Sequence, residues 1–356
     1  MGLRLEKRRE PSRAMLYLAP VLAVLMTMVA GAGVFTVIGV HGVEAIEIIF
    51  FEPLLNSARW QDLGVKAAPM IVIACGLAYG FRANVWNIGA EGQYVAGALA
   101  GTWVALTFDG GAGAATLPLM CLAGVLGGMA WAAIPAFLRT RFGVNEILTS
   151  LMLTYVAIQL LQYLTRGPWR DPDGFNFPQT RMFSRAESMP VIIDRTVIHL
   201  GVALALVVAF VMWFVMQKTV AGFAGRVVGL APAAARYGGI SEKRTIWLAL
   251  MIGGGLAGLA GIFEATGPFG QLTPQFAVGY GFSAIIVAFL GRLHPFGIIL
   301  GALVLAVSIV GGEVAQTAIG VPYAAIGIFQ AMMLFFLLAV DVLVRYRLVW
   351  RGEAHA

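Results

Sequence analysis

Long apolar segments alternate with short polar connections along most of the chain. A helix needs about 20 apolar residues to cross the hydrocarbon core of a bilayer, and runs near this length recur with few charges inside them. They predict an all-α, polytopic membrane protein with about ten transmembrane helices. The predicted spans cover residues 14–40, 67–80, 93–108, 114–138, 147–164, 196–216, 245–263, 281–291, 296–311 and 322–342.

The charges in the connections predict the orientation. Arginine and lysine collect in residues 1–13, 139–146, 217–244 and 343–356, and because positive charge favours the cytoplasmic side, all four are expected there. The number of spans is then even. Loop 165–195, with five arginines and four acids, is placed outside by its flanking spans. The domain organisation is one transmembrane domain, 14–342, between cytoplasmic tails 1–13 and 343–356.

Composition agrees with this class. The chain is 60% apolar and only 12% charged, about half the charge of a typical soluble domain. Its net charge of +6 comes from basic residues beside apolar segments, so membrane topology explains it without a nucleic-acid partner.

The order of the spans indicates a duplication. Spans two to five begin outside and spans seven to ten begin inside, as two four-span units of an inverted repeat do. Segments 41–66 and 165–195 both face outward in this arrangement. They form either a docking platform for a partner or plain solvated connections.

The most informative stretch is 81–101, FRANVWNIGAEGQYVAGALAG. The apolar segment before it, 67–80, is too short to cross a bilayer as one straight helix. Unpaired polar groups are costly in hydrocarbon, so this stretch is expected to lie within protein or to line a watery pathway. Amide side chains that donate and accept hydrogen bonds suit a neutral polyhydroxy or nucleoside-like solute. The candidate pathway residues are Asn84, Trp86, Asn87, Glu91, Gln93 and Phe282. The alternative is a cytoplasmic turn whose asparagines cap helix ends.

Two acids, Glu91 and Glu264, are embedded deeply between predicted spans. An intramembrane acid is a functional candidate. In an ion-coupled carrier one of them would be the coupling group, whereas in an ATP-driven permease each would accept hydrogen bonds from backbone at a helix break. The second role needs no titration and is the one we favour.

Loop 217–244, named here the coupling loop, is the predicted contact for a cytoplasmic partner. Residues 231–237 predict two turns of helix, with Pro232 in the first turn and glycines 238 and 239 ending it. A short rigid element between two spans can fit a partner's groove and transmit its motion. An ordinary intracellular connection is the alternative.

Enzyme chemistry finds no support. The sequence has no GxxxxGK[ST], HExxH or GxSxG motif, and its four histidines lack metal-ligand spacing. We therefore expect no catalytic residue, metal or cofactor on this chain, and we expect any ATP hydrolysis to belong to another subunit.

Four stretches resemble the permease subunits of bacterial ABC importers for simple sugars and nucleosides, in the branched-chain-type permease family. They are NVWNIGAEGQYVAGALAG (84–101), RFGVNEILTSLMLTYVA (141–157) with GPWRDP (167–172), RVVGLAPAAARYGGI (226–240) and GYGFSAIIVAFLGRLHPFG (279–297). They occur in the expected order over most of the chain. The length and the GPWRDP segment resemble the longer of the two paired permeases of nucleoside importers.

The resemblance implies a ten-span fold of the vitamin-B12-importer type, with both termini in the cytoplasm, in the bacterial cytoplasmic (inner) membrane. It also implies partners: a second, similar permease, an ATPase subunit that carries ATP and Mg, and an extracytoplasmic substrate-binding protein or lipoprotein. It assigns the ATPase contact to Arg226, Gly229, Pro232, Arg236 and Tyr237. Relatives usually carry Asn before the proline, whereas this chain has Ala231, so a side-chain cap worth about 1 kcal/mol is missing.

The expected function is a permease subunit that forms the pathway for a small polar solute, a nucleoside first and a monosaccharide second. The ATPase would drive it by alternating access. A secondary transporter working alone with ion coupling is the main alternative, followed by a membrane-embedded assembly subunit without transport.

Overall fold

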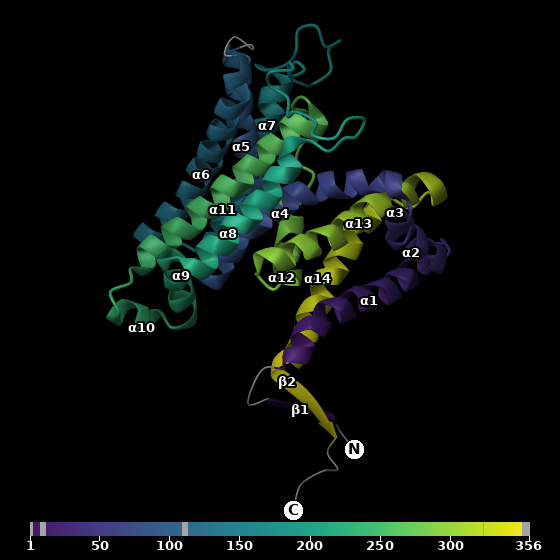
Figure 1. The fold of residues 1–356 in the computed structure, drawn as a ribbon, viewed down its shortest axis with the longest axis vertical. Coiled ribbons are helices and arrows are strands. Elements are labelled where there is room, and N and C mark those ends of the chain that lie inside the picture. The colour runs from purple at the N-terminus through teal and green to yellow at the C-terminus, as the bar shows by residue number, and fades with distance from the viewer. Residues whose placement is uncertain (1–2, 8–11, 109–112, 323, 351–356) are drawn as a thin grey trace, which may run out of the picture. The chain divides into compact units, whose positions relative to one another are not determined.

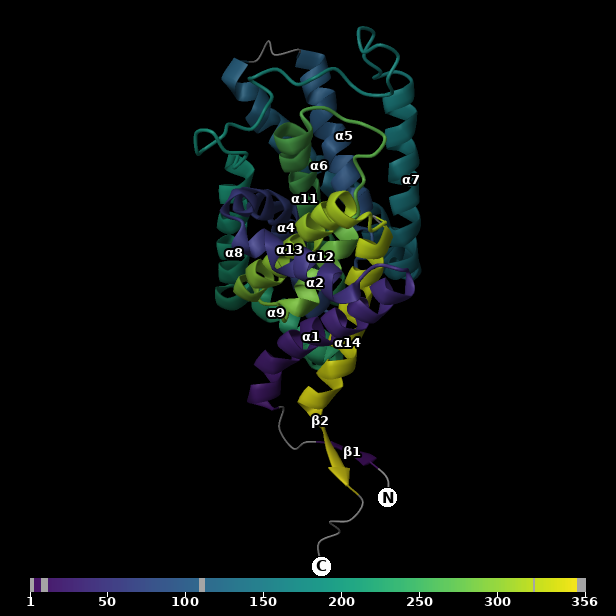
Figure 2. The ribbon, with the colours of Figure 1, turned by 90° about the vertical axis from the view of Figure 1, so that its right-hand side faces the viewer.

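The computed structural model describes residues 3–7, 12–108, 113–322 and 324–350. The chain divides into two compact units: unit 1 consists of residues 1–60 and 307–356, and unit 2 of residues 61–306. The elements, shown in Figures 1 and 2, are in chain order β1 (Leu3–Lys7), α1 (Arg13–Val37), α2 (Gly42–Phe50), α3 (Glu52–Leu55), η1 (Ser57–Arg59), α4 (Trp60–Arg82), α5 (Ala90–Phe108), η2 (Gly113–Ala115), α6 (Thr116–Phe142), α7 (Glu146–Arg166), α8 (Leu200–Lys218), α9 (Val220–Leu230), α10 (Pro232–Tyr237), α11 (Glu242–Glu264), the π-helical turn η3 (Ala265–Phe269), α12 (Tyr280–Leu290), α13 (Pro295–Ile319), α14 (Ala324–Arg345) and β2 (Tyr346–Trp350).

Eight helical segments among the described residues are long and apolar enough to cross a membrane. They correspond to α1, α4, α6, α7, α8, α11, α13 and α14, and eight of the ten predicted spans fall on them. The other two fall on α5, which begins with polar residues, and on α12, whose 11 residues reach only about 17 Å. The polytopic helical architecture is confirmed, whereas the count of ten is not.

One premise about helix length is wrong. Segment 67–80 is not a short span, because α4 is one continuous helix of 23 residues that extends well before it. The polar residues at its start are accommodated by partners distant in sequence. Gln61 accepts a hydrogen bond from the backbone N–H of Val197, and Lys66 interacts electrostatically with Glu264. The hydropathy of a short window of sequence cannot detect partners that are distant along the chain.

In the described part of the two tails the chain forms two strands, which an all-α expectation misses. Strand β1 pairs antiparallel with β2, with Leu3 opposite Trp350 and Lys7 opposite Tyr346. The sequence LRLEK of β1 begins with the apolar–polar alternation that is typical of strands, whereas YRLVW of β2 ends in three apolar residues. Residues 1–2, 8–11 and 351–356 of the predicted tails lie outside the described part of the chain.

Unit 1 is built on the pairing of α1 with α14, which lie side by side in Figure 1. Ala19 of α1 packs with Val340 and Val344 of α14. The short helix α2 adds Phe50, whose ring packs against that of Phe329, with the centroids 5.2 Å apart.

Unit 2 has a core of three closely packed helices, α5, α6 and α11. Their glycines allow backbone-to-backbone contact: a Cβ on Gly97 would lie 2.2 Å from the Cα of Gly258, and a Cβ on Gly128 would lie 2.1 Å from the carbonyl oxygen of Gly254. The pairs Gly97–Gly101, Gly124–Gly128 and Gly254–Gly258 have the four-residue spacing of small residues that is typical of packing faces in membrane helices, and all of these glycines lie at close contacts in unit 2.

Loop 165–195 is an ordered part of unit 2, not a solvated connection. Its backbone N–H groups at Thr180, Phe183 and Met189 donate to carbonyl oxygens of segment 266–272 at 2.8–3.0 Å. The guanidinium of Arg181 makes two 2.9 Å hydrogen bonds to the Glu187 carboxylate and one to the Ala105 carbonyl at the end of α5. The loop is thereby fixed to α5 and to the segment that follows α11.

A glycine-to-alanine pair tests the close packing. Gly97→Ala places its methyl group into the backbone of α11, so we expect a loss of about 1–3 kcal/mol of stability. Gly33→Ala is the matched control, because no atom lies within 4 Å of its added Cβ. The melting temperature of the purified permease in detergent should fall only for Gly97→Ala. Equal shifts for the two variants would contradict backbone contact at Gly97.

The Arg181–Glu187 pair predicts an acid-sensitive loop. Burial by itself raises the pKa of Glu187, but hydrogen bonds from Arg181 and Ser184 outweigh it and hold that pKa below its ordinary value of 4.5. The pair therefore stabilises the loop fully above about pH 4.5, and this contribution is lost as the pH falls through the lowered pKa.

Proteolytic cleavage of loop 165–195 should accordingly rise on acidification in the parent protein. Glu187→Gln should be cleaved readily at neutral pH and show little further change, whereas the control Asp173→Asn, at an exposed acid, should behave like the parent. Identical pH profiles for the parent and Glu187→Gln would exclude this role of the carboxylate.

Candidate functional site

Between α4 and α5 the chain leaves helical geometry at residues 83–89, named here the break segment. Six of its seven backbone N–H groups donate hydrogen bonds. Those of residues 83–85 return to carbonyl oxygens of α4, while Trp86 N–H donates to the Glu146 carboxylate at 3.3 Å and Ile88 N–H to the Ser150 hydroxyl at 3.2 Å. The start of α7 thus supplies the acceptors that irregular backbone needs among apolar helices.

Two of the predicted pathway residues satisfy each other. The side-chain amides of Asn87 and Gln93 exchange two hydrogen bonds, of 2.8 and 3.1 Å, and Asn87 Oδ1 also accepts from the N–H of Gly89. Both side chains are buried. Their donors and acceptors are therefore directed at the break segment itself and not at an open channel.

Glu91 binds the start of α12. Its carboxylate oxygens accept hydrogen bonds from the N–H of Gly279 at 2.8 Å and of Gly281 at 2.6 Å. The buried carboxyl group lies at the positive end of the α12 dipole. A Cβ on Gly281 would lie 2.2 Å from the Glu91 backbone nitrogen, so the two helix starts are in direct contact. The expectation that this acid accepts backbone hydrogen bonds at a helix break is confirmed.

The second embedded acid, Glu264, is also buried and ends α11. It accepts a 3.4 Å hydrogen bond from the hydroxyl of Tyr280, the first residue of α12. Both acids therefore contact the beginning of the same short helix, but Glu264 does so through a side-chain hydroxyl and not through the expected backbone N–H.

The aromatic pathway candidates lie on the accessible side of this arrangement. Trp86 is half-buried, stacks on Phe289 of α12 at 5.9 Å and packs against Phe81 at 5.1 Å, while its indole N–H donates to Asn84. Asn84 itself is exposed and Phe282 is partly exposed. Of the six predicted residues, the structure thus turns Asn84, Trp86 and Phe282 outward and Asn87, Glu91 and Gln93 inward.

The coupling loop folds as two helices, α9 and α10, and α9 is seated on the end of α4. The Tyr79 hydroxyl donates to the Ala221 carbonyl at 3.1 Å, and a Cβ on Gly229 would lie 2.0 Å from the Arg82 carbonyl oxygen. Arg226 is half-buried and donates to Gln217 at 3.4 Å. The end of α4 that α9 contacts leads directly into the break segment.

Helix α10 matches its predicted bounds and faces outward. It starts at Pro232, ends before Gly238, and has no side-chain cap at Ala231, as expected. Ala235 is buried, whereas Pro232, Arg236 and Tyr237 are exposed, Tyr237 almost completely. The five predicted coupling residues therefore divide into Arg226 and Gly229 near α4 and three exposed residues on α10.

Both basic internal segments lie at one end of unit 2. A hollow of about 410 Å³ is lined by residues from 139–146 and by Glu242, Lys243 and Ile246 of α11. Burial first, and the nearby Arg82 guanidinium second, lower the pKa of His294 in the turn between α12 and α13. This end therefore carries the α4, α6, α9 and α12 termini together.

Sequence reasoning missed three residues that hold the site. Glu146 pairs with Arg139 and accepts from Trp86, Ser150 accepts from Ile88, and Tyr79 fixes α9. The available signal was the VNE sequence at 144–146, since Asn145 is a regular N-cap that accepts from Ile147 N–H at 2.8 Å and marks a helix start.

The chain is similar in sequence to one protein family and to several known permeases. The family described as branched-chain amino acid transport system, permease component, matches residues 61–338. A glucose ABC transporter permease of Haloferax volcanii is 39% identical over 97% of this chain and 93% of its own. A guanosine ABC transporter permease of Bacillus subtilis is 31% identical over 90% and 92% of the two chains, and a nucleoside ABC transporter permease of Lactococcus lactis is 28% identical over 90% of each.

Bacillus subtilis and Lactococcus lactis each have a second matching permease, which is described with the same cargo as the first. It aligns with 67% of this chain in B. subtilis and with 70% in L. lactis. No solved structure matches the chain significantly.

Replacing Glu91 tests the contact between the helix starts. In Glu91→Gln one acceptor oxygen becomes an NH₂ donor that faces a backbone N–H, so about 1.5–3 kcal/mol of stability should be lost. Thermal unfolding of the purified permease measures this, with the exposed Asp194→Asn as the control. A Glu91→Gln protein that melts with the parent would show that the two hydrogen bonds contribute nothing.

Proposed function

Because the chain belongs to the family of branched-chain amino acid transport system permease components, we propose that it forms part of the import pathway for nucleosides. It is the permease subunit of an ABC transporter, as its relatives are. The expectation that it is not an enzyme is confirmed by this family, in which ATP hydrolysis belongs to a separate subunit.

Nucleosides are the proposed cargo because two relatives from different organisms, each aligned over 90% of this chain, are described as guanosine and nucleoside permeases. The accessible aromatic surface of Trp86 and Phe289 supports this choice, since a flat base stacks on aromatic rings. A monosaccharide is the second candidate. It is favoured by the 39% identity with a glucose permease.

The pathway wall is proposed to consist of the outward-facing candidates Asn84, Trp86 and Phe282. The inward-facing Asn87, Glu91 and Gln93 support this wall by fixing the break segment and the start of α12. Their role is to position the wall and not to bind the solute.

The proposed topology has ten membrane segments with both termini in the cytoplasm. α5 and α12 complete the count as helices that begin inside the bundle, each after a long helix, α4 or α11. This matching order, with the two starts meeting at Glu91 and Gly281, supports the inverted repeat and a vitamin-B12-importer-like fold. The two basic segments 139–146 and 217–244 lie at the same end of unit 2, which supports placing the coupling loop in the cytoplasm.

The proposed mechanism is alternating access driven from α10. An ATPase subunit holding ATP and Mg would contact Pro232, Arg236 and Tyr237. Its motion would pass from α10 to α9, from α9 to the end of α4 through Tyr79, Arg82 and Gly229, and from there to the break segment.

The proposed partners also include a second permease and an extracytoplasmic binding protein. The paired permeases of B. subtilis and L. lactis support a heterodimer, and the larger share of this chain that aligns with one member of each pair supports its place as the longer subunit. The proposed location is the cytoplasmic (inner) membrane of a bacterium. The ordered loop 165–195 is the proposed platform for the binding protein.

Uptake measurements test the cargo. Vesicles that contain the complete transporter should accumulate labelled guanosine when ATP is supplied inside, and unlabelled nucleosides should compete, whereas glucose should not. Glucose uptake that nucleosides leave unchanged would favour the second candidate. Uptake that follows a proton or sodium gradient without ATP would overturn the ATP-driven mechanism.

A charge reversal tests the coupling surface. Arg236 is 72% exposed and its 3.9 Å pairing with Glu242 contributes little to folding, so Arg236→Glu should insert normally but lose at least about tenfold of the co-purified ATPase. Arg185→Glu makes the same change on loop 165–195 and should retain the ATPase. If only Arg185→Glu lost the ATPase, the proposed orientation would be reversed.

A further inference from the structure

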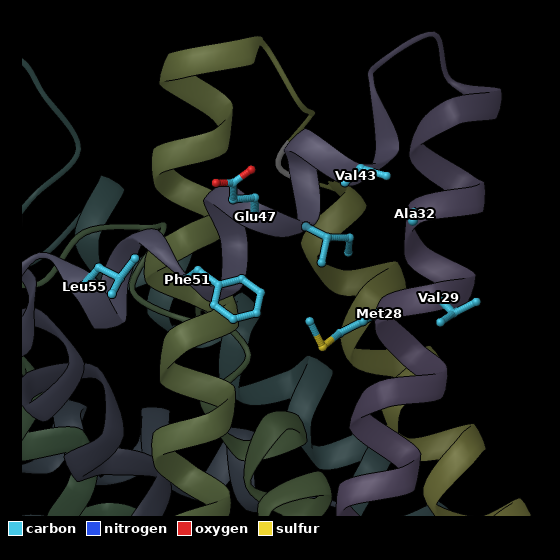
Figure 3. Close-up of a pocket in the computed structure, with 8 residues that line it drawn as sticks. Met28, Val29, Ala32, Val43, Glu47, Phe51 and Leu55 are labelled. Carbon is cyan, nitrogen blue, oxygen red and sulfur yellow. The ribbon is translucent and has the colours of Figure 1, made fainter.

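Unit 1 contains a groove with an apolar floor and one acidic end (Figure 3). It has a volume of about 510 Å³ and lies between α1 and the pair α2–α3. All but one of its lining residues are apolar, among them Met28, Val29, Val43, Phe51 and Leu55. The exception is Glu47, whose carboxylate stands at the rim in Figure 3.

The groove is preformed by close packing. Gly42 at the start of α2 touches α1, since a Cβ there would lie 2.0 Å from the Ala32 carbonyl oxygen. Near the other end of α2, a Cβ on Gly311 of α13 would lie 1.9 Å from the Ile49 carbonyl oxygen. Because α2 is held near both of its ends, the space between it and α1 is a fixed feature of unit 1.

The groove opens along a helix that is long and apolar enough to cross a membrane, α1. Val29, Val43 and Leu55 at its edges are 76%, 79% and 83% exposed. Val29 lies on that helix, so its exposed side chain faces hydrocarbon, and an apolar chain and not water is the natural filling of the groove beside it.

The acidic end continues into a second, more polar hollow of about 780 Å³, which shares Glu47, Phe51 and Leu55 with the groove. Glu44, Glu47 and Glu52 contribute carboxylates to it, and no arginine or lysine is among the described residues that line either hollow. Glu44 and Glu47 lie on the exposed face of α2 and make no hydrogen bond or ion pair with the described residues. Carboxylates beside hydrocarbon require a cation.

We propose that this groove binds a phospholipid with a primary ammonium head group, as in phosphatidylethanolamine. One acyl chain fills the apolar groove, and the ammonium donates hydrogen bonds to Glu44 and Glu47. A primary ammonium has three donors for two carboxylates, whereas a trimethylated ammonium has charge but no donor, and an anionic head is repelled. The order of preference is therefore phosphatidylethanolamine, then phosphatidylcholine, then phosphatidylglycerol.

Native mass spectrometry of the complete permease complex tests this order. The complex is stripped of lipid and offered each of the three lipids with identical chains. Retention of phosphatidylethanolamine should exceed that of phosphatidylglycerol on the order of tenfold. The double variant Glu44→Gln/Glu47→Gln should lower phosphatidylethanolamine to the level of phosphatidylcholine. The matched double variant Asp171→Asn/Asp173→Asn, on the outer loop, should leave retention unchanged.

A second variant separates the groove from the head-group contact. Val29→Trp fills the groove from its exposed edge and should reduce retention of all three lipids alike, without altering the carboxylates. Two outcomes would overturn the proposal: equal retention of the three lipids by the parent, or unchanged phosphatidylethanolamine binding in the Glu44→Gln/Glu47→Gln protein. A Leu55→Cys crosslink to the second permease in the intact complex would also overturn it, because the groove would then be a permease–permease interface. The readout is lipid retention, so it does not depend on the proposed cargo.

Discussion

A helix that begins inside a bundle of apolar helices must find acceptors for its first backbone N–H groups. Helix α12 has this requirement, and Glu91 meets it with two hydrogen bonds to Gly279 and Gly281. The carboxyl group also lies at the positive end of the helix dipole, where carboxyl oxygens are favoured. Because Glu91 itself lies in the first turn of α5, one side chain joins the starts of two helices. The absence of a side chain at Gly281 allows the two starts to touch.

The neighbouring segments hold the contact between Glu91 and the start of α12 in place. The break segment that precedes α5 depends on Glu146 and Ser150 of α7, and the amide pair of Asn87 and Gln93 closes it from within. The glycine contacts of α5, α6 and α11 make these helices a closely packed body. In the proposed mechanism, a displacement of α4 by α9 would therefore reach the break segment before it reaches α5, since the break segment is the direct continuation of α4.

The sequence was informative wherever a feature depends on neighbours along the chain. Glycines at four-residue spacing, the proline and glycine bounds of α10, and the missing cap at Ala231 are local patterns, and the structure agrees with each. That Glu91 accepts backbone hydrogen bonds could be predicted, because an acid without hydrogen-bond partners between apolar spans is energetically unfavourable. Family resemblance then extended these patterns to the permease class.

The rest depends on contacts across the fold, which no local pattern encodes. The extent of α4 was underestimated because Gln61 and Lys66 find partners about 136 and 198 residues away in sequence. The same limit applies to the pathway candidates. Their polarity was visible, but the direction of Asn87 and Gln93 is set by each other, and the roles of Glu146 and Ser150 appear only when α7 packs beside the break segment. The ribbon of β1 and β2 likewise pairs the two ends of the chain.

The inward direction of the amides has a consequence for how a solute is handled. Donors and acceptors already satisfied within the break segment offer little to a polar cargo, and the proposed wall of Asn84, Trp86 and Phe282 contains only one residue with an amide, next to two aromatic side chains. Such a wall gives contact area without many directional hydrogen bonds, which limits both affinity and discrimination. A pathway that must release its solute at the far side benefits from weak binding. Selection of the cargo is then best made before entry, by a partner whose site provides the hydrogen bonds that this chain uses to hold itself together.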